Sequence, residues 1–418
     1  MKLLIKQAQV IAPSSPLNGK KQDILIENGK ITRITASITG QADQVISEEG
    51  ICVSPGWMDI FADFADPGQE YRETIETGAR AAAAGGFTDV MLIPNTSPVT
   101  DTKAQADYLV QKGKQTPVNI HPIAAITRKT EGKDLAEMYD MHQAGAIAFG
   151  DGIHPVQSAG LLLKALQYVK TIDGTVIQLP DDSSIGANGL MNEGIVSTRM
   201  GLSGKPIVAE ELMVARDIKL ARYTESRLHF TGISSPKSLE YIKRGKEGGI
   251  QISCSITPYQ AFFCDEDLAG YNTHLKLNPP LRNRNDMMAI RQALFDGSVD
   301  CIASHHLPQH WDGKACEFEY ARYGMISLET MFAVVTTLGL DPQTFVQMQA
   351  VNARRLFGLP VPEIAEGADA CLTIFAPAAA FTPDEKNIRS KSKNSPFTGM
   401  PLKGKVIGIV NKAQVHLN

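Results

Sequence analysis

The amino-acid sequence predicts an α/β protein: a (β/α)8 TIM barrel with a small composite β domain formed by both ends of the chain. Between residues 53 and 362, eight short apolar runs alternate with helix-like stretches, which is the pattern of repeated βα units. Eight such units favour a closed barrel over an open sheet. The flanking segments, 1–52 and 363–418, alternate apolar with polar residues as strands do, so we expect them to form one β-sandwich domain.

The strands of the small domain come from both termini. KLLIKQAQVIA and DILIENGKITRITASI alternate as strands do, and Asn28-Gly29 supplies the turn of a hairpin. Strand patterning returns near the other end of the chain, in ADACLTIFAP and LKGKVIGIVNKAQVHL. The two ends are therefore predicted to share one domain beside the barrel.

The barrel region contains eight apolar runs that predict its strands. They are WMDIF, FTDVMLIP, NIHPIAAI, AIAFG, TVIQL, RLHFTGI, IQISCSI and DCIAS. The spacing predicts helices between them at 73–84, 135–144, 160–170, 209–223, 235–245 and 286–295. Because βα loops converge at the carboxyl ends of barrel strands, we look for chemistry there.

Composition excludes several classes of protein. Hydrophobic residues make up 43% and charged residues 21% of the 418 residues, which is typical of a globular protein. The net charge is −4 with no basic block, so we expect neither nucleic acid nor a membrane as a partner. The start of the chain lacks a signal-peptide pattern and no apolar run reaches 18 residues, which predicts a cytoplasmic protein. The six cysteines include no CxxC pair and are expected to be buried thiols.

A long stretch that includes the first barrel strand carries a family resemblance. PGWMDIFADFADPGQEYRETIETGARAAAAGGFTDVMLIPNTSPVTD is similar to the first part of the barrel in the dihydroorotases of the amidohydrolase superfamily. Further matching segments follow in the order that family shows: LHFTGISSPKSLEYIKRGKEGGI, LKLNPPLRNRNDMMAIRQAL, GMISLETMFAVV and SKSKNSPFTGMPLKGKV. The resemblance covers nearly the whole chain. It implies a barrel of the metal-dependent hydrolase type and the interconversion of carbamoyl aspartate and dihydroorotate in pyrimidine biosynthesis.

The family's metal-binding positions are altered in this sequence. Its His-x-His-x-Arg motif on the first strand falls on Phe61, Asp63 and Ala65. The histidine of the fifth strand falls on Leu179, and the second histidine of the HxxH pattern on the sixth strand falls on Gly232, while His229 is retained. The resemblance therefore identifies four degenerate ligand positions: Phe61, Asp63, Leu179 and Gly232. Ala65 cannot make the bidentate carboxylate contact that arginine provides.

The eighth strand ends in a second altered motif. The family's Asp-His-Ala-Pro-His becomes His305-His306-Leu307-Pro308-Gln309. By resemblance, His305 occupies the position of the catalytic general base and Gln309 that of a substrate-contacting histidine. Asn95 and Asn278 match the remaining substrate-binding positions. Either asparagine could instead satisfy backbone groups in a loop.

The remaining metal-ligand candidates are few. Asp63, Asp151 and His305 are the residual donors, with Asp151 matching the family's bridging carboxylate, although Asp-Gly after a strand is also ordinary turn chemistry. A catalytic zinc needs about three protein ligands and lowers the pKa of water from about 16 to near 7. We therefore expect no metal cofactor; zinc would be required if these three residues formed a rebuilt site.

Three functions follow from this pattern. The leading hypothesis is a catalytically defective dihydroorotase-like protein that serves as a structural or regulatory partner of aspartate transcarbamoylase, a role known among inactive members of the family. The alternative is an active dihydroorotase or related cyclic amidohydrolase with one metal. A third possibility is a sensor that binds a pyrimidine intermediate through Asn95 and Asn278. Barrels of this type are often dimers, so a homo-oligomer is expected.

Overall fold

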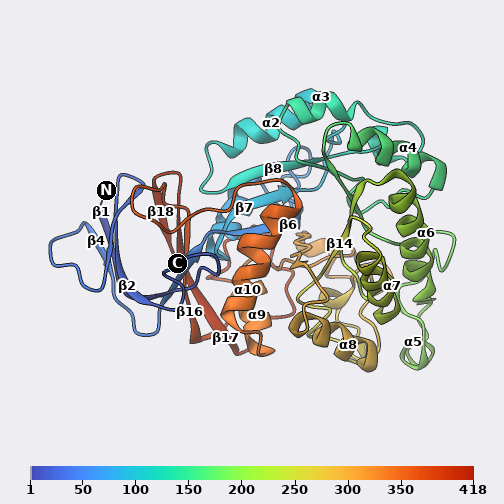
Figure 1. Cartoon of the computed structure of the whole chain (residues 1–418). Helices are drawn as coiled ribbons and strands as arrows, with labels where there is room; N and C mark the ends of the chain where they lie inside the picture. The colour runs from blue at the N-terminus through green and yellow to red at the C-terminus, as the bar shows by residue number, and fades with distance from the viewer. Residues whose placement is uncertain (1) are drawn as a thin grey trace.

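A parallel barrel of eight strands forms the larger part of the molecule (Figure 1). The computed structural model describes residues 2–418. The barrel strands are β6 (Trp57–Ala62), β7 (Phe87–Leu92), β8 (Asn119–Ala124), β9 (Ala148–Phe149), β10 (Thr175–Gln178), β13 (Arg227–Phe230), β14 (Ile252–Ile256) and β15 (Cys301–Ile302). They are hydrogen-bonded in the order β15-β14-β13-β10-β9-β8-β7-β6, so all eight predicted strands are confirmed.

The first and last strands meet to close the barrel. A parallel bridge joins Ala62 to His306. Beside it, the buried carboxylate of Asp59 accepts hydrogen bonds of 2.7 Å from both the backbone N–H and the hydroxyl of Ser304. The end of β15 is thereby fixed against β6, which places Phe61 and His305 on neighbouring strand ends.

Helices surround the barrel (Figure 1). They are α1 (Ile75–Ala84), α2 (Lys103–Gly113), α3 (Met138–Gln143), α4 (Ala159–Lys170), α5 (Ile195–Met200), α6 (Val208–Thr224), α7 (Pro236–Glu247), α8 (Arg284–Phe295), α9 (Met331–Thr337), α10 (Pro342–Val346) and α11 (Ala353–Leu356). All six predicted barrel helices are present within a few residues of their expected ends. Thr74 caps the start of helix α1, and its side chain accepts a hydrogen bond from the N–H of Thr77 in a capping box.

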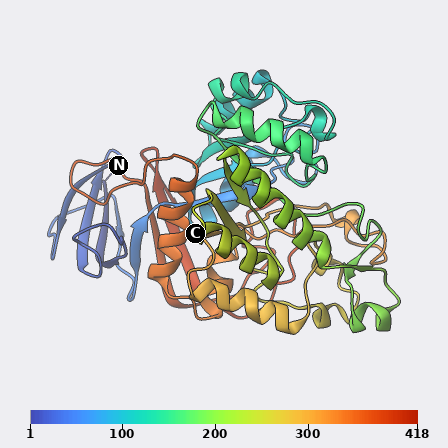
Figure 2. The ribbon, with the colours of Figure 1, turned by 45° about the vertical axis from the view of Figure 1, so that its right-hand side comes forward.

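A mixed sheet of eight strands lies beside the barrel (Figure 2). Its strands are β1 (Lys2–Val10), β2 (Lys21–Glu27), β3 (Lys30–Thr35), β4 (Gln44–Ile46), β5 (Cys52–Pro55), β16 (Leu372–Phe381), β17 (Leu402–Asn411) and β18 (Gln414–Leu417). Strands from both ends of the chain are neighbours in this sheet, because β5 pairs with β16. The predicted hairpin joins β2 to β3, and Asn28 and Gly29 both have the positive φ that its turn needs. The strands form one continuous hydrogen-bonded sheet to which both ends of the chain contribute.

Trp57 joins the core of the barrel to the sheet. It is fully buried at the start of β6, and its ring contacts the rings of Phe87, Phe332, Phe345 and Phe375 at centroid distances between 4.8 and 6.3 Å. These phenylalanines come from β7, α9, α10 and β16, so one aromatic cluster packs elements of both parts together.

A segment of the sheet domain also reaches the barrel mouth. Residues 388–394, between β16 and β17, are called the strap below. The hydroxyl of Ser392 donates to the carbonyl oxygen of Arg72 at 2.6 Å, and the side-chain carbonyl of Asn394 accepts from the N–H of Gln309 at 3.0 Å. The strap therefore ties the loop after β6 to the loop after β15.

Two further expectations concern the cysteines and membrane spans. All six cysteines are free thiols, and four of them are buried: Cys52, Cys254, Cys264 and Cys301. Within residues 2–418, no helix is long and apolar enough to cross a membrane.

Candidate functional site

Phe61 and His305 lie against each other at the carboxyl ends of β6 and β15. Their ring centroids are 4.3 Å apart and the ring planes are inclined by 26°, which is a stacked arrangement. Each residue is only 1% exposed. By the family resemblance, Phe61 occupies a metal-ligand position and His305 the position of the general base. In this chain the two side chains pack as neighbours in the barrel core.

Leu179 and Gly232 lie against the same imidazole ring. A Cβ atom added to Gly232 would lie 2.7 Å from Cε1 of His305 and 3.2 Å from Cδ1 of Leu179, closer than such atoms ordinarily approach. Gly232 also has a φ of +69°, which side chains other than glycine rarely adopt. The space beside residue 232 is thus filled by the imidazole of His305 and the side chain of Leu179.

His305 is hydrogen-bonded within the barrel. Its Nε2 lies 2.7 Å from the hydroxyl of Thr231, which in turn accepts a hydrogen bond from Ser255. Ser255 also contacts Nε2 of His229 at 3.0 Å, while Ser253 contacts Nδ1 of that histidine at 2.8 Å. Burial lowers the pKa of His305 to about 3, and it is also the main cause that lowers the pKa of His229 to about 3. Both imidazoles are therefore neutral near pH 7.

Asp63 forms a buried ion pair. One oxygen of its carboxylate accepts a hydrogen bond of 2.6 Å from a terminal nitrogen of Arg72, and the other accepts from the N–H of Ala65 at 2.7 Å. Both side chains are less than a tenth exposed. The carboxylate of Asp63 is thus already neutralised by a guanidinium group.

Asp151 and Asn95 both organise loops. The carboxylate of Asp151 accepts hydrogen bonds of 2.9 Å from the N–H groups of Ile126 and Thr127, and a further one from the hydroxyl of Thr127. Burial raises the pKa of Asp151 to about 6, against the opposing effect of these hydrogen bonds. The amide of Asn95 donates to the carbonyl of Asp151 at 3.1 Å and accepts from the N–H of Ile153 at 3.0 Å.

Asn278 also has protein partners. The ammonium of Lys205 donates to its side-chain oxygen at 2.9 Å and to the carboxylate of Asp181 at 2.5 Å. The amide nitrogen of Asn278 completes this triangle by donating to Asp181 at 3.3 Å.

Gln309 is held between the strap and the loop after β15. Its side-chain amide nitrogen donates to the carbonyl of Tyr323 at 2.9 Å, while its backbone N–H donates to Asn394. The side-chain oxygen of Gln309 is buried and has no hydrogen-bond partner among residues 2–418. Gln309 and Arg72 line a cavity of about 480 Å³ at the rim of the barrel mouth.

The structure pairs His306, which belongs to the altered motif of the eighth strand, with Glu73, a buried residue that the sequence analysis did not single out. Nδ1 of His306 accepts the N–H of Ser327 at 3.2 Å, and its Nε2 lies 3.7 Å from the carboxylate of Glu73. That carboxylate also accepts hydrogen bonds from the hydroxyl of Ser390 and the N–H of Lys391 in the strap. Burial opposes ionisation of Glu73, but its pKa is lowered on balance by His306 and by the hydroxyl groups of Ser390 and Thr77. The only sequence signal was the charged Arg72-Glu73 pair soon after a barrel strand.

The residual donors do not converge on a common point. Asp63 is directed to Arg72, Asp151 to the loop after β8, and His305 to Thr231. Throughout residues 2–418, no group of three or more His, Cys, Asp or Glu side chains is placed to hold a metal ion. These donors, as arranged, do not fit a catalytic zinc, which requires about three protein ligands around one open position.

Comparisons with known proteins define first the class of fold. L-hydantoinase (dihydropyrimidinase) from Arthrobacter aurescens superposes with a TM-score of 0.86 over 99% of this chain and 95% of its own, at 22% identity. A D-hydantoinase superposes with a TM-score of 0.84 over 100% of this chain and 95% of its own, at 18% identity. At such low identity these matches establish the fold alone: a TIM barrel of the amidohydrolase type with its accompanying sheet domain.

Sequence comparison then gives the family. The family model described as dihydro-orotase-like matches residues 50–238. A dihydroorotase from Pelotomaculum thermopropionicum is 42% identical over 411 residues, covering 97% of this chain and 96% of the relative. A dihydroorotase from Syntrophus aciditrophicus is 39% identical over 414 residues, covering 97% of both chains. The chain belongs to the dihydroorotase family of the amidohydrolase superfamily.

Proposed function

We propose that this chain serves pyrimidine biosynthesis as a dihydroorotase homologue without metal-dependent activity of its own, and acts as a structural or regulatory partner of aspartate transcarbamoylase. The observation that carries the proposal is the packing of His305 against Phe61 beside Gly232. A side chain large enough to ligate a metal has no room at residue 232 while the imidazole of His305 stays where it is.

The engagement of the residual carboxylates supports the same proposal. Hydrolysis of a ring amide in this family depends on metal-bound water, and the metal needs ligands whose lone pairs are free. Asp63 is neutralised by Arg72, and Asp151 receives three hydrogen bonds from the loop after β8. Freeing either carboxylate would leave its partners buried without a hydrogen bond, at a cost of about 1–3 kcal/mol for each group.

The residues at the family's substrate-binding positions also support the proposed loss of activity. Ala65 stands where the family places the arginine that binds the substrate carboxylate, and it is fully buried. Asn95, Asn278 and Gln309 make hydrogen bonds within the protein. Loss of substrate positioning alone costs several kcal/mol of the activation barrier.

The fold around the altered site is intact, which favours a function other than catalysis for this protein. Relatives named dihydroorotase match over 97% of the chain, so the fold and its sheet domain are retained. The altered positions cluster at the barrel mouth, where the chemistry of the family would occur. We therefore infer that this chain functions through the outer surface of the barrel and not through its mouth. A structural role in an assembly of the same pathway accounts for that pattern.

The test is co-elution with the aspartate transcarbamoylase of the same cell. Both proteins are purified, mixed at equal concentration and separated by gel filtration with light scattering. We expect one complex with the mass of a defined assembly, and no turnover of dihydroorotate by this chain alone. Two independently eluting proteins would contradict the partnership, whereas turnover by the purified chain would contradict the loss of activity.

The second candidate is an active cyclic amidohydrolase with one metal held by Asp63, Asp151 and His305. The sequence identity of 42% to a protein named dihydroorotase favours it. Elemental analysis after incubation with zinc and gel filtration separates the two functions. Metal below one equivalent per chain supports the leading proposal. One equivalent that is lost in Asp63→Ala would establish a rebuilt site.

A further inference from the structure

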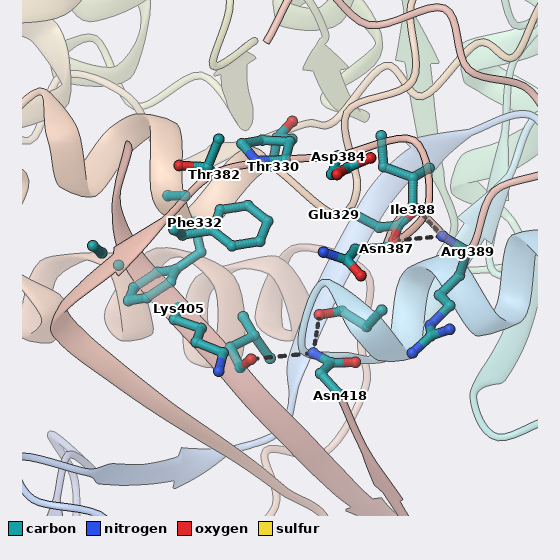
Figure 3. Close-up of a pocket in the computed structure, with 17 residues that line it drawn as sticks. Glu329, Thr330, Phe332, Thr382, Asp384, Asn387, Ile388, Arg389, Lys405 and Asn418 are labelled. Atoms are coloured by element: carbon teal, nitrogen blue, oxygen red, sulfur yellow. Dashed lines mark hydrogen bonds between the residues drawn. The ribbon is translucent and has the colours of Figure 1, made fainter. Parts of the chain in front are cut away.

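A second cavity lies where the barrel meets the sheet domain, and it has no part in the proposed function. Its volume is about 300 Å³, within the range of pockets that hold small molecules. Figure 3 shows the side chains that line it. They come from the end of α1, the start of α9, β16, β17, the segment that follows β16, and Asn418. None of the altered metal-ligand positions lines this cavity.

Two cations in its wall have no acidic partner. Arg389 and Lys405 both line the cavity, and neither side chain forms an ion pair or a hydrogen bond within residues 2–418. In Figure 3 their side chains lie on opposite sides of Asn418. Arg72 and Lys205 at the barrel mouth are, by contrast, paired with carboxylates.

The two carboxylates in the wall are already occupied. Both oxygens of Glu329 accept the N–H of Arg389, at 3.0 and 2.8 Å, and one accepts the N–H of Ser390 at 3.0 Å. Burial raises the pKa of Glu329 in spite of these bonds. Asp384 accepts the N–H of Lys386 at 3.0 Å in a local turn. The carboxylates are thus engaged by backbone N–H groups, whereas the side-chain N–H donors of Arg389 and Lys405 remain available to a ligand.

Part of the cavity wall is apolar. Phe332 and Ala333 from α9, Ala84 at the end of α1 and Ile388 supply its hydrophobic surface. The side chain of Asn387 lies between Phe332 and Arg389 in Figure 3 and makes no hydrogen bond of its own. The cavity wall thus combines apolar side chains with two cations and an amide.

We propose that this cavity binds a small organic anion with an apolar body, a carboxylate or a phosphate ester. The anionic group lies between Arg389 and Lys405, where charge-assisted hydrogen bonds are available, and the apolar body packs on Phe332. Arg389 belongs to the strap, so the bound anion touches the segment that crosses the barrel mouth. The site is independent of whether the barrel has lost its chemistry.

Calorimetry with defined probes tests the site on the full chain. Phenyl phosphate and benzoate carry the anion on a ring, and benzyl alcohol carries no charge. We expect saturable binding of at least one anion and none of benzyl alcohol; the stronger of the two anions identifies a phosphate ester or a carboxylate. The variant Arg389→Gln/Lys405→Gln should bind at least about tenfold more weakly, since loss of one charge-assisted contact is worth about 1.4 kcal/mol or more.

Matched controls remove the same charges elsewhere. Lys403 is exposed on the same strand as Lys405, and Arg355 is exposed on α11; neither lines the cavity. Lys403→Gln and Arg355→Gln should leave binding unchanged. Because all four side chains are exposed, we expect every variant to fold with an unchanged melting temperature. The proposal is overturned if neither anion binds saturably to the unmodified chain, or if binding persists in the double variant.

Discussion

The imidazole of His305 lies flat against the ring of Phe61, with centroids 4.3 Å apart, on two strand ends that meet where the barrel closes. Phe61 belongs to the first barrel strand and His305 follows the last one, so their contact helps to close the barrel. In the family pattern, the position of Phe61 holds a metal ligand and that of His305 holds the general base. Here they contribute to the hydrophobic interior, which has direct consequences for stability.

Truncating Phe61 should destabilise the protein strongly. Phe61→Ala removes a fully buried ring at the barrel seam, and such changes cost about 3–5 kcal/mol of the free energy of unfolding. Urea denaturation followed by circular dichroism measures the loss. Phe295, 42% exposed on α8, supplies the control, since Phe295→Ala should cost well under half as much. A loss of less than about 1 kcal/mol for Phe61→Ala would mean that the ring is not a packing element.

Restoring a histidine at residue 232 should fail unless His305 is also changed. Gly232→His introduces a Cβ atom 2.7 Å from the imidazole of His305 and a non-glycine residue at positive φ, so we expect a loss of about 2–4 kcal/mol. His305 itself has a φ of 45°, which glycine adopts readily. In a double-mutant cycle with His305→Gly, the coupling free energy should favour the double variant by about 1 kcal/mol or more. Strictly additive losses would show that the imidazole does not block residue 232.

Replacing only Arg72 of the Asp63–Arg72 ion pair should lower the free energy of unfolding more than replacing both residues. Arg72→Met leaves a buried carboxylate without its cation, which costs about 3–5 kcal/mol. Asp63→Asn/Arg72→Met removes both charges and should lose distinctly less. Lys133→Met provides a surface control, because the pair of Lys133 with Glu131 is exposed and contributes about 0–1 kcal/mol. An equal loss of unfolding free energy in the single and double variants would mean that the buried carboxylate of Asp63 does not need a cationic partner.

The neutral buried histidines should make the fold sensitive to acid. The pKa of His305 is about 3 in the folded chain and about 6.5 when unfolded, so the unfolded state takes up the proton first as the pH falls. Below about pH 6.5 the free energy of unfolding therefore decreases, by up to about 1.4 kcal/mol per pH unit for this residue. Replacing His305 by Gln removes that dependence.

The measurement is the difference in unfolding free energy between the unmodified chain and His305→Gln, taken from pH 7 to pH 4. Asp151 acts in the opposite direction, because its pKa is raised to about 6 and the folded state gains stability as that carboxyl becomes protonated. Asp151 is present in both proteins, so its effect cancels in the difference. A difference that stays constant over this interval would show that His305 is protonated in the folded state.

The fold could be predicted from the sequence because its signals are local. Each of the eight barrel strands is a short apolar run, and the turn between β2 and β3 needs the two residues Asn28 and Gly29. The helix α2 was not predicted, because its sequence, KAQADYLVQKG, buries only three residues and carries a weak apolar stripe. Periodicity detects a helix only when one face is clearly apolar.

The altered positions of the site could be named from the sequence, but their partners could not. Loss of a histidine at residue 61 does not say that the replacement stacks on His305, 244 positions away in the chain. The pairing of Asp63 with Arg72 spans only nine residues, yet nothing in the sequence distinguishes the buried Arg72 from a solvent-exposed cation. The contact between Glu73 and the strap joins residues more than 300 positions apart and depends entirely on the tertiary fold.

The shared sheet imposes an order on synthesis at the ribosome. Strand β5 pairs along its antiparallel edge with β16, which begins at Leu372 and is made only after the entire barrel. Until then that edge presents unpaired N–H and C=O groups beside apolar side chains, a surface on which nascent chains associate. A chain interrupted before β16 thus carries an open strand edge and is a natural substrate for chaperones, however well its barrel has formed.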